Sequence, residues 1–131
     1  MKQFITIPYY NWKVFIYYTI SEEEKNNLIT MFNSNNIKDI TRESIINNLN
    51  NSSLDTGFIY SNYDDKYSII VIHKASSIGE FINTFEHEKT HLNMHICDAL
   101  DINPYSEKAA HLNGDISQLI IEKALYSIIE L

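Results

Sequence analysis

The chain has 131 residues, of which 44% are hydrophobic and 21% are charged, a composition typical of one compact globular domain over residues 1–131. Its net charge is −7 and no cluster of Lys and Arg stands out, which argues against binding to nucleic acid or to a membrane surface. The single cysteine, Cys97, excludes an internal disulfide, and no apolar run is long enough for an export signal or a membrane span. A cytoplasmic protein is therefore expected.

The first part of the chain shows a strand pattern followed by a helix pattern. Two runs rich in β-branched and aromatic residues, Phe4–Ile7 and Lys13–Ile20, predict strands. Ser21–Glu24 has the form of a capping box and predicts a helix that ends near Phe32. Thr41 is expected to cap a second, short helix.

A hairpin and two helices are expected in the rest of the chain. Phe58–Ser61 and Tyr67–His73 have the composition of paired strands. Ser77 then caps a long helix whose apolar residues recur at helical spacing: Ile78, Phe81, Ile82, Phe85, Leu92, Ile96, Ala99 and Leu100. Asn103 and Pro104 are expected to begin a final helix. The pattern predicts an α+β fold, with a small, mostly antiparallel sheet packed against helices.

The long helix contains an H-E-x-x-H motif at residues 87–91. Residues four apart share one face of a helix, so the imidazoles of His87 and His91 can converge on one ion, and zinc prefers such nitrogen ligands. Glu88 is rotated from His87 by about 100°, so it reaches a water on the metal rather than the metal itself. That is the position of a general base. The motif predicts a catalytic zinc site, and the alternative is a solvated helix face.

The final helix offers candidates for a third zinc ligand. Glu107, His111 and Asp115 recur every four residues on one of its faces, after a turn short enough for this helix to fold back on the first. His95 lies two turns beyond His87, about 12 Å along the axis, which is too far for both to bind one ion comfortably. His95 is therefore expected at the rim of the site or partly buried.

The motif and its context resemble those of a minimal, gluzincin-like zincin metallopeptidase, and the chain is similar to small HExxH proteins of bacteria and their phages. The resemblance covers about residues 57–115: the hairpin, the motif helix and the segment Pro104–Leu112. The longer metzincin motif does not fit, because Met94 and Cys97 stand where it has a glycine and a third histidine. Cys97 is instead expected to be buried.

The resemblance implies three protein ligands for Zn²⁺: His87, His91 and Glu107. It also implies that Glu88 is the general base. His111 is the alternative third ligand. Tyr105 or His111 is a candidate for a hydrogen bond to the oxyanion that forms during hydrolysis.

The predicted function is that of a zinc-dependent metallopeptidase, which hydrolyses peptide bonds of a peptide or protein substrate through a metal-bound water. The substrate would lie extended along an edge strand of the sheet, either Tyr67–His73 or Lys13–Ile20. The alternative is a binding protein that keeps the zincin scaffold and its metal but contacts a protein partner, for example in phage–host interplay. The tyrosine-rich segment Pro8–Trp12 would then be the interface.

Overall fold

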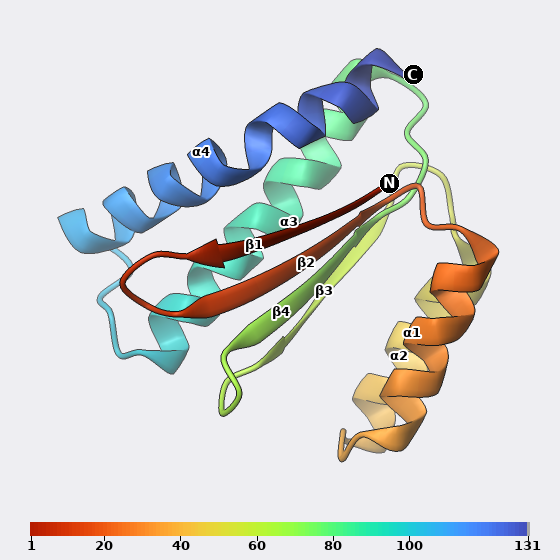
Figure 1. Cartoon of the computed structure of the whole chain (residues 1–131), viewed down its shortest axis with the longest axis horizontal. Coiled ribbons are helices and arrows are strands. Elements are labelled where there is room, and N and C mark those ends of the chain that lie inside the picture. Colours follow the sequence, from red (N-terminus) through yellow and green to blue (C-terminus); the bar gives the residue numbers. More distant parts are fainter. Residues whose placement is uncertain (131) are drawn as a thin grey trace.

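The computed structural model describes residues 1–130, which form four strands and four helices (Figure 1). In chain order the elements are β1 (Lys2–Ile7), β2 (Trp12–Tyr18), α1 (Glu22–Ser34), α2 (Asp39–Asn51), β3 (Gly57–Asn62), β4 (Tyr67–Ile72), α3 (Ile78–Ala99) and α4 (Glu107–Ile129). The strands form one sheet in the order β1-β2-β4-β3. The predicted α+β class is confirmed, and the sheet is mixed: β1–β2 and β3–β4 are antiparallel, whereas β2–β4 is parallel.

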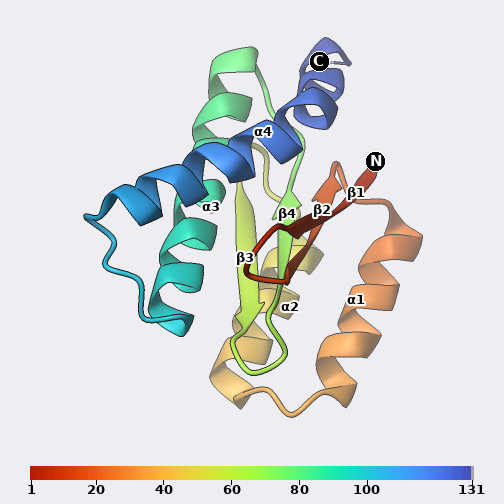
Figure 2. The same ribbon diagram turned by 60° about the vertical axis from the view of Figure 1, so that its left-hand side comes forward.

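The sheet separates two helical layers, with α3 and α4 on one face and α1 and α2 on the other (Figure 2). Alternate residues of the central strands enter the two cores. Val14 and Ile16 of β2 pack under α3 and α4, whereas Tyr17 packs toward α1 and α2. Because β2 and β4 are buried on both faces, their sequences are nearly continuous apolar runs.

The position of the strands corrects one prediction. The segments proposed as substrate-binding edges, Tyr67–His73 and Lys13–Ile20, correspond to β4 and β2, which pair with each other in the middle of the sheet. Each of these two strands has a paired neighbour on both sides, β1 and β4 for β2, and β2 and β3 for β4, so neither offers a free edge. The edge strand beside α3 is β3, and the other edge of the sheet is β1.

Side-chain caps set the helix starts. The Ser21 hydroxyl accepts a hydrogen bond from the Glu24 backbone N–H, and the Glu24 carboxylate accepts one from the Ser21 N–H, which confirms the predicted capping box. Ser77 likewise accepts from the N–H of Glu80 at the start of α3. The predicted cap of α2 is wrong, because that helix begins at Asp39, ahead of Thr41.

The start of α4 also differs from the prediction. Asn103 lies in a turn, where its carbonyl accepts a hydrogen bond from the Ser106 N–H and its side chain accepts one from the Tyr105 N–H. The helix begins at Glu107, with Ser106 as its N-cap. The turn therefore takes up the residues that were expected to form the first helical turn.

The long helices are amphipathic. Of the predicted apolar stripe on α3, Phe81, Phe85, Leu92 and Ile96 are buried, whereas Ile78 and Ile82 are 54% and 47% exposed. Ile78 lies in the first turn of α3, and Ile82 lies at the margin of its buried face. Two charged residues, Glu88 and Lys89, are also buried, one on each flank of that face. Across residues 1–130, no helix combines the length and apolar character needed to cross a membrane.

Candidate metal centre

His87 and His91 turn their rings toward each other on the side of α3 that faces away from α4. Their Nε2 atoms are 3.2 Å apart and their ring centroids 4.8 Å apart. For zinc–nitrogen bonds of about 2.0–2.1 Å, two ligands of a tetrahedral ion lie about 3.3 Å from each other. The two imidazoles therefore have the separation that two zinc ligands need. The same separation suits one N–H···N hydrogen bond between neutral rings.

Glu88, between the two histidines in sequence, is buried to 6% exposure. In the described part of the chain its carboxylate takes part in neither a hydrogen bond nor an ion pair, and its oxygens are open to solvent. It borders a hollow of about 280 Å³ that is also lined by His87, Thr84 and Gly57. Burial raises the pKa of Glu88, and the charge of the neighbouring His87 opposes that rise. A carboxylate held in this way is suited to accepting a proton.

Gly57 allows α3 to lie close to the edge strand. A Cβ at this position would lie 2.5 Å from the Val71 carbonyl oxygen, 3.1 Å from Thr84 Cγ2 and 3.5 Å from Glu88 Cγ. A residue with a side chain would therefore force β3 away from the Val71 carbonyl of β4 and press against Thr84 of α3. Gly57 was not among the predicted site residues, although a glycine inside a strand is a known signal of close backbone approach.

Asp55 also borders this hollow, but its carboxylate is already engaged. One of its oxygens accepts a hydrogen bond from the Ser76 N–H and the other from the Ser76 hydroxyl, both at 2.7 Å. Its backbone carbonyl accepts from the Thr84 hydroxyl at 3.1 Å. Asp55 therefore fixes the start of β3 against α3.

The predicted third ligands lie apart from the histidine pair. Lys89 contacts Ser117 of α4, and Glu107 lies ten residues before Ser117, about 15 Å along the helix axis. His111 is on the same solvent-exposed face of α4 as Glu107. Tyr105 is 96% exposed in the preceding turn.

The helix lengths explain this placement. α3 continues for two turns beyond His91, and α4 begins after a seven-residue connection, so the start of α4 lies level with the end of α3. Within residues 1–130, no three His, Cys, Asp or Glu side chains are arranged to hold a metal ion. Glu107 and His111 remain predicted ligands, and neither lies beside the histidine pair in this arrangement.

A chain of hydrogen bonds holds His95, the third histidine on this side of α3. The Trp12 indole N–H donates to the Ser68 hydroxyl at 2.9 Å, the Ser68 and Ser61 hydroxyls are 2.7 Å apart, and Ser61 Oγ lies 2.7 Å from His95 Nδ1. Ser68 is fully buried, so this chain of hydrogen bonds links His95 to the core of the sheet through two hydroxyl groups.

His95 continues the row of imidazoles along α3. Its ring centroid lies 6.1 Å from that of His91 and 6.1 Å from that of Tyr63. Burial lowers the pKa of His95 and the charge of His91 lowers it further, while Asp98 opposes both. The side chain is half-buried, which confirms the prediction for this residue. Its Nδ1 atom is occupied by Ser61, so His95 has a structural role in this arrangement.

The free edge of β3 runs beside this row. His73 N–H donates to the Thr56 carbonyl, and by the alternation of an antiparallel ladder the backbone groups of Gly57, Ile59 and Ser61 point away from β4. The Gly57 carbonyl accepts a long hydrogen bond of 3.4 Å from the Asn48 side chain of α2. Hollows beside β3 are lined by α2 and by Phe58–Ser61. The edge therefore forms the floor of a groove between α2 and α3.

Comparison with protein-family models, with curated proteins and with solved structures finds no match to this chain. Its function is therefore inferred from its own residues and their geometry.

Proposed function

We propose that the chain is a zinc-dependent peptidase in which His87 and His91 bind the ion and Glu88 is the general base. The observation that supports this most is the pairing of two features on one helix turn. The Nε2 atoms of the two histidines are 3.2 Å apart, and the largely buried Glu88 borders the hollow beside His87. Burial raises the pKa of Glu88, and carboxyl groups perturbed in this way gather at functional sites.

Each residue of the proposed site has a distinct role. His87 and His91 would supply two of the three protein ligands that a catalytic zinc site uses, with Glu107 the predicted third and His111 its alternative. A bound zinc ion would supply a water of lowered pKa and polarise the substrate carbonyl. Glu88 would take a proton from that water and return it to the leaving amine nitrogen. The raised pKa of Glu88 suits transfer in both directions.

The substrate would be an extended peptide paired with the free edge of β3. This edge offers outward backbone groups at Ile59 and Ser61, and it runs beside the histidine row. Main-chain hydrogen bonds of this kind bind a peptide largely independently of its sequence. Gly57 and Glu88 lie at the end of β3 where the scissile bond would be placed.

The test combines metal content with cleavage. Purified protein is expected to bind one zinc ion per chain, the His87→Ala His91→Ala double variant none, and the Glu88→Gln variant one ion. The wild-type chain is expected to cleave members of a peptide library, and Glu88→Gln is not. Single variants Glu107→Gln and His111→Ala identify the third ligand by the larger loss of zinc affinity. A wild-type chain that binds no zinc contradicts the proposal.

A second candidate is a zinc-holding protein that acts by contacting a partner. It is favoured by the absence, within residues 1–130, of a third ligand beside the histidine pair. The interface predicted for it changes, because Trp12 is fully buried and holds Ser68, whereas Tyr9 is 97% exposed. Zinc binding without cleavage of any library peptide would favour this second candidate.

A further inference from the structure

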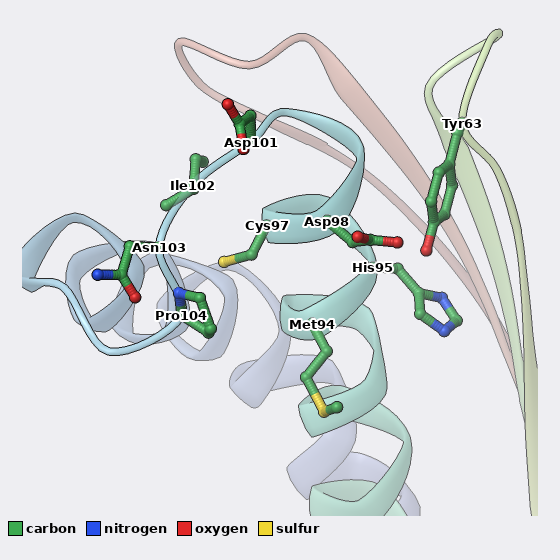
Figure 3. A pocket seen from close by; sticks show the side chains of 9 residues that line it. All are labelled: Tyr63, Met94, His95, Cys97, Asp98, Asp101, Ile102, Asn103 and Pro104. Atoms are coloured by element: carbon green, nitrogen blue, oxygen red, sulfur yellow. The ribbon is translucent and has the colours of Figure 1, made fainter.

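A second hollow, of about 580 Å³, lies at the C-terminal end of α3 (Figure 3). It extends from the turn between β3 and β4, where Tyr63 lies, to the connection between α3 and α4, where Pro104 lies. Its volume is in the range of ligand-binding pockets. The catalytic proposal does not use it.

The walls of this hollow combine apolar surface with negative charge. Met94, Ile102 and Pro104 supply apolar surface, and Met94 is 52% exposed. Asp98 and Asp101 supply two carboxylates, and none of the lining residues is Lys or Arg. An aliphatic stem that ends in a cation matches both properties of such walls.

The helix end adds to the negative potential. The last turn of α3 contains no basic residue, so the partial negative charge of the helix C-terminus is not offset there. In the described part of the chain neither Asp98 nor Asp101 forms an ion pair. The hydroxyl of Tyr63 points toward the Asp98 carboxylate (Figure 3), and the face of its ring is a further site of attraction for a cation.

The hollow continues the groove along β3. His95 and Tyr63 line it, and they also line the hollow that runs beside Ile59, Tyr60 and Ser61. Asp98 lies seven residues beyond His91, about 10 Å along the helix axis, and eleven beyond His87, about 16 Å. An extended peptide rises about 3.3 Å per residue, so this distance corresponds to about three to five residues.

We propose that this hollow binds the side chain of a Lys or Arg in a peptide whose backbone pairs with the free edge of β3. The inference rests on the proposed function for its position: the basic residue lies three to five residues from the scissile bond. The stem of the side chain packs against Met94 and Ile102, and its cationic head is attracted by the negative charge of Asp98 and Asp101 in the walls. The site thereby selects basic peptides, which the acidic net charge of −7 also attracts.

The first test is the cleavage preference of the chain. In a peptide library randomised on both sides of the cleaved bond, Lys and Arg are expected to be enriched about tenfold at one position three to five residues away. The Asp98→Asn Asp101→Asn variant is expected to cleave the library without that enrichment. The control is Glu23→Gln Glu122→Gln, which removes the same charge from exposed positions on α1 and α4 and is expected to keep the preference.

The second test measures binding without catalysis. The chain has three methionines, so ¹³C-methyl labelling of the Glu88→Gln protein gives a separate NMR signal for Met94 in the hollow and for Met31 in α1. A short Thr/Val peptide with one central Lys is expected to shift the Met94 signal and not that of Met31. The same peptide with norleucine in place of Lys is expected to bind about tenfold more weakly. High salt is expected to reduce that difference.

The outcomes separate the two proposals. Cleavage without a Lys or Arg preference, together with an unchanged Met94 signal, overturns the basic side-chain site and leaves the peptidase intact. A Lys-dependent Met94 shift in a chain that cleaves nothing supports the basic side-chain site and removes the catalytic proposal. Equal affinity for the Lys and norleucine peptides shows an apolar site and overturns the inference.

Discussion

The two flanks of α3 each bury one charged residue, and these two residues differ in their hydrogen-bond and ion-pair partners. Toward α4, Lys89 is buried to 6% exposure, and its ammonium donates to the Ser117 hydroxyl at 2.7 Å and pairs with Glu86 at 3.1 Å. Toward β3, Glu88 is buried to the same 6%, yet no side chain in residues 1–130 pairs with it. Burial of a charged group costs free energy, which the partners of Lys89 offset and which the solvent-facing oxygens of Glu88 reduce only in part.

This difference separates a structural position from a candidate catalytic one. Lys89 joins the two long helices through its contact with Ser117. An uncharged residue of the same size would stabilise the fold at least as well as Glu88. Its position beside the converging imidazoles is instead what a general base requires. A residue that is unfavourable for folding, such as a largely buried carboxylate without a protein partner, is expected at functional sites.

The largest expected effect is on the rate of hydrolysis. Replacing Glu88 with Gln keeps the shape of the side chain and removes the base, so peptide cleavage is expected to fall by about 10²–10⁴-fold. The neighbouring change Lys89→Gln is the matched control and is expected to keep the rate within a few fold. Initial rates on one library-selected peptide measure both variants. Equal losses in the two variants would mean that the flanks do not differ in function.

The next largest effect is expected at Gly57, on the Glu88 flank. The Gly57→Ala change places a Cβ 2.5 Å from the Val71 carbonyl oxygen, so the backbone of the sheet must shift. The free energy of unfolding is expected to fall by about 1–3 kcal/mol. Urea denaturation followed by circular dichroism measures this loss. Gly114→Ala, on the exposed face of α4 with open space around it, is the control and is expected to leave the chain as stable or more stable.

A smaller loss of stability is expected on the Lys89 flank. Lys89→Ala removes the hydrogen bond to Ser117 and the ion pair with Glu86, and the latter is exposed enough to remain hydrated. The free energy of unfolding is expected to fall by about 1–2 kcal/mol. The double variant with Ser117→Ala should lose less than the sum of the two single losses, because the residues share one contact. A strictly additive result would show that the contact contributes nothing.

The smallest expected effect is the pH dependence of stability at Glu88. Burial raises the pKa of this carboxyl above its ordinary value of 4.5, with His87 opposing. The neutral form is therefore favoured by folding, and the stability that it contributes is present at low pH and is lost as the pH rises through the folded-state pKa. The Tm of Glu88→Gln is thus expected to exceed that of the wild type near neutral pH, and the gap should narrow on acidification. A gap that widens on acidification contradicts a raised pKa.

Local patterns in the sequence predicted most elements of the fold. The capping box at Ser21, the hairpin of β3 and β4 and the long helix after Ser77 are all determined by residues close together in the chain. The order of the strands is not, because the pairing of β2 with β4 depends on residues far apart in sequence. The wrong choice of edge strands followed from that.

The candidate site divides in the same way. The pairing of His87 with His91 and the position of Glu88 follow from helix geometry. The five residues of the motif were therefore enough to predict both. The placement of Glu107 depends on where α3 ends and α4 begins, and the turn at Asn103 moved that start by three residues. Gly57 and Ser61 lie in close contact with residues of α3 that are far from them in sequence. These contacts depend on how β3 is placed in the sheet, which local sequence patterns do not predict.

The parallel ladder between β2 and β4 also has a consequence for how the chain reaches this fold. Each hairpin forms from neighbouring residues, but α1 and α2 must be looped out before the two hairpins can join. Such long-range closure is slow, and until it occurs the apolar edges of both central strands stay open to other chains. A fragment that starts at Asp55 would carry the histidines, Glu88 and the β3 edge, yet it would leave β4 unpaired along one side. Assembly of the centre thus depends on an N-terminal hairpin that contains neither the proposed zinc ligands nor the proposed base.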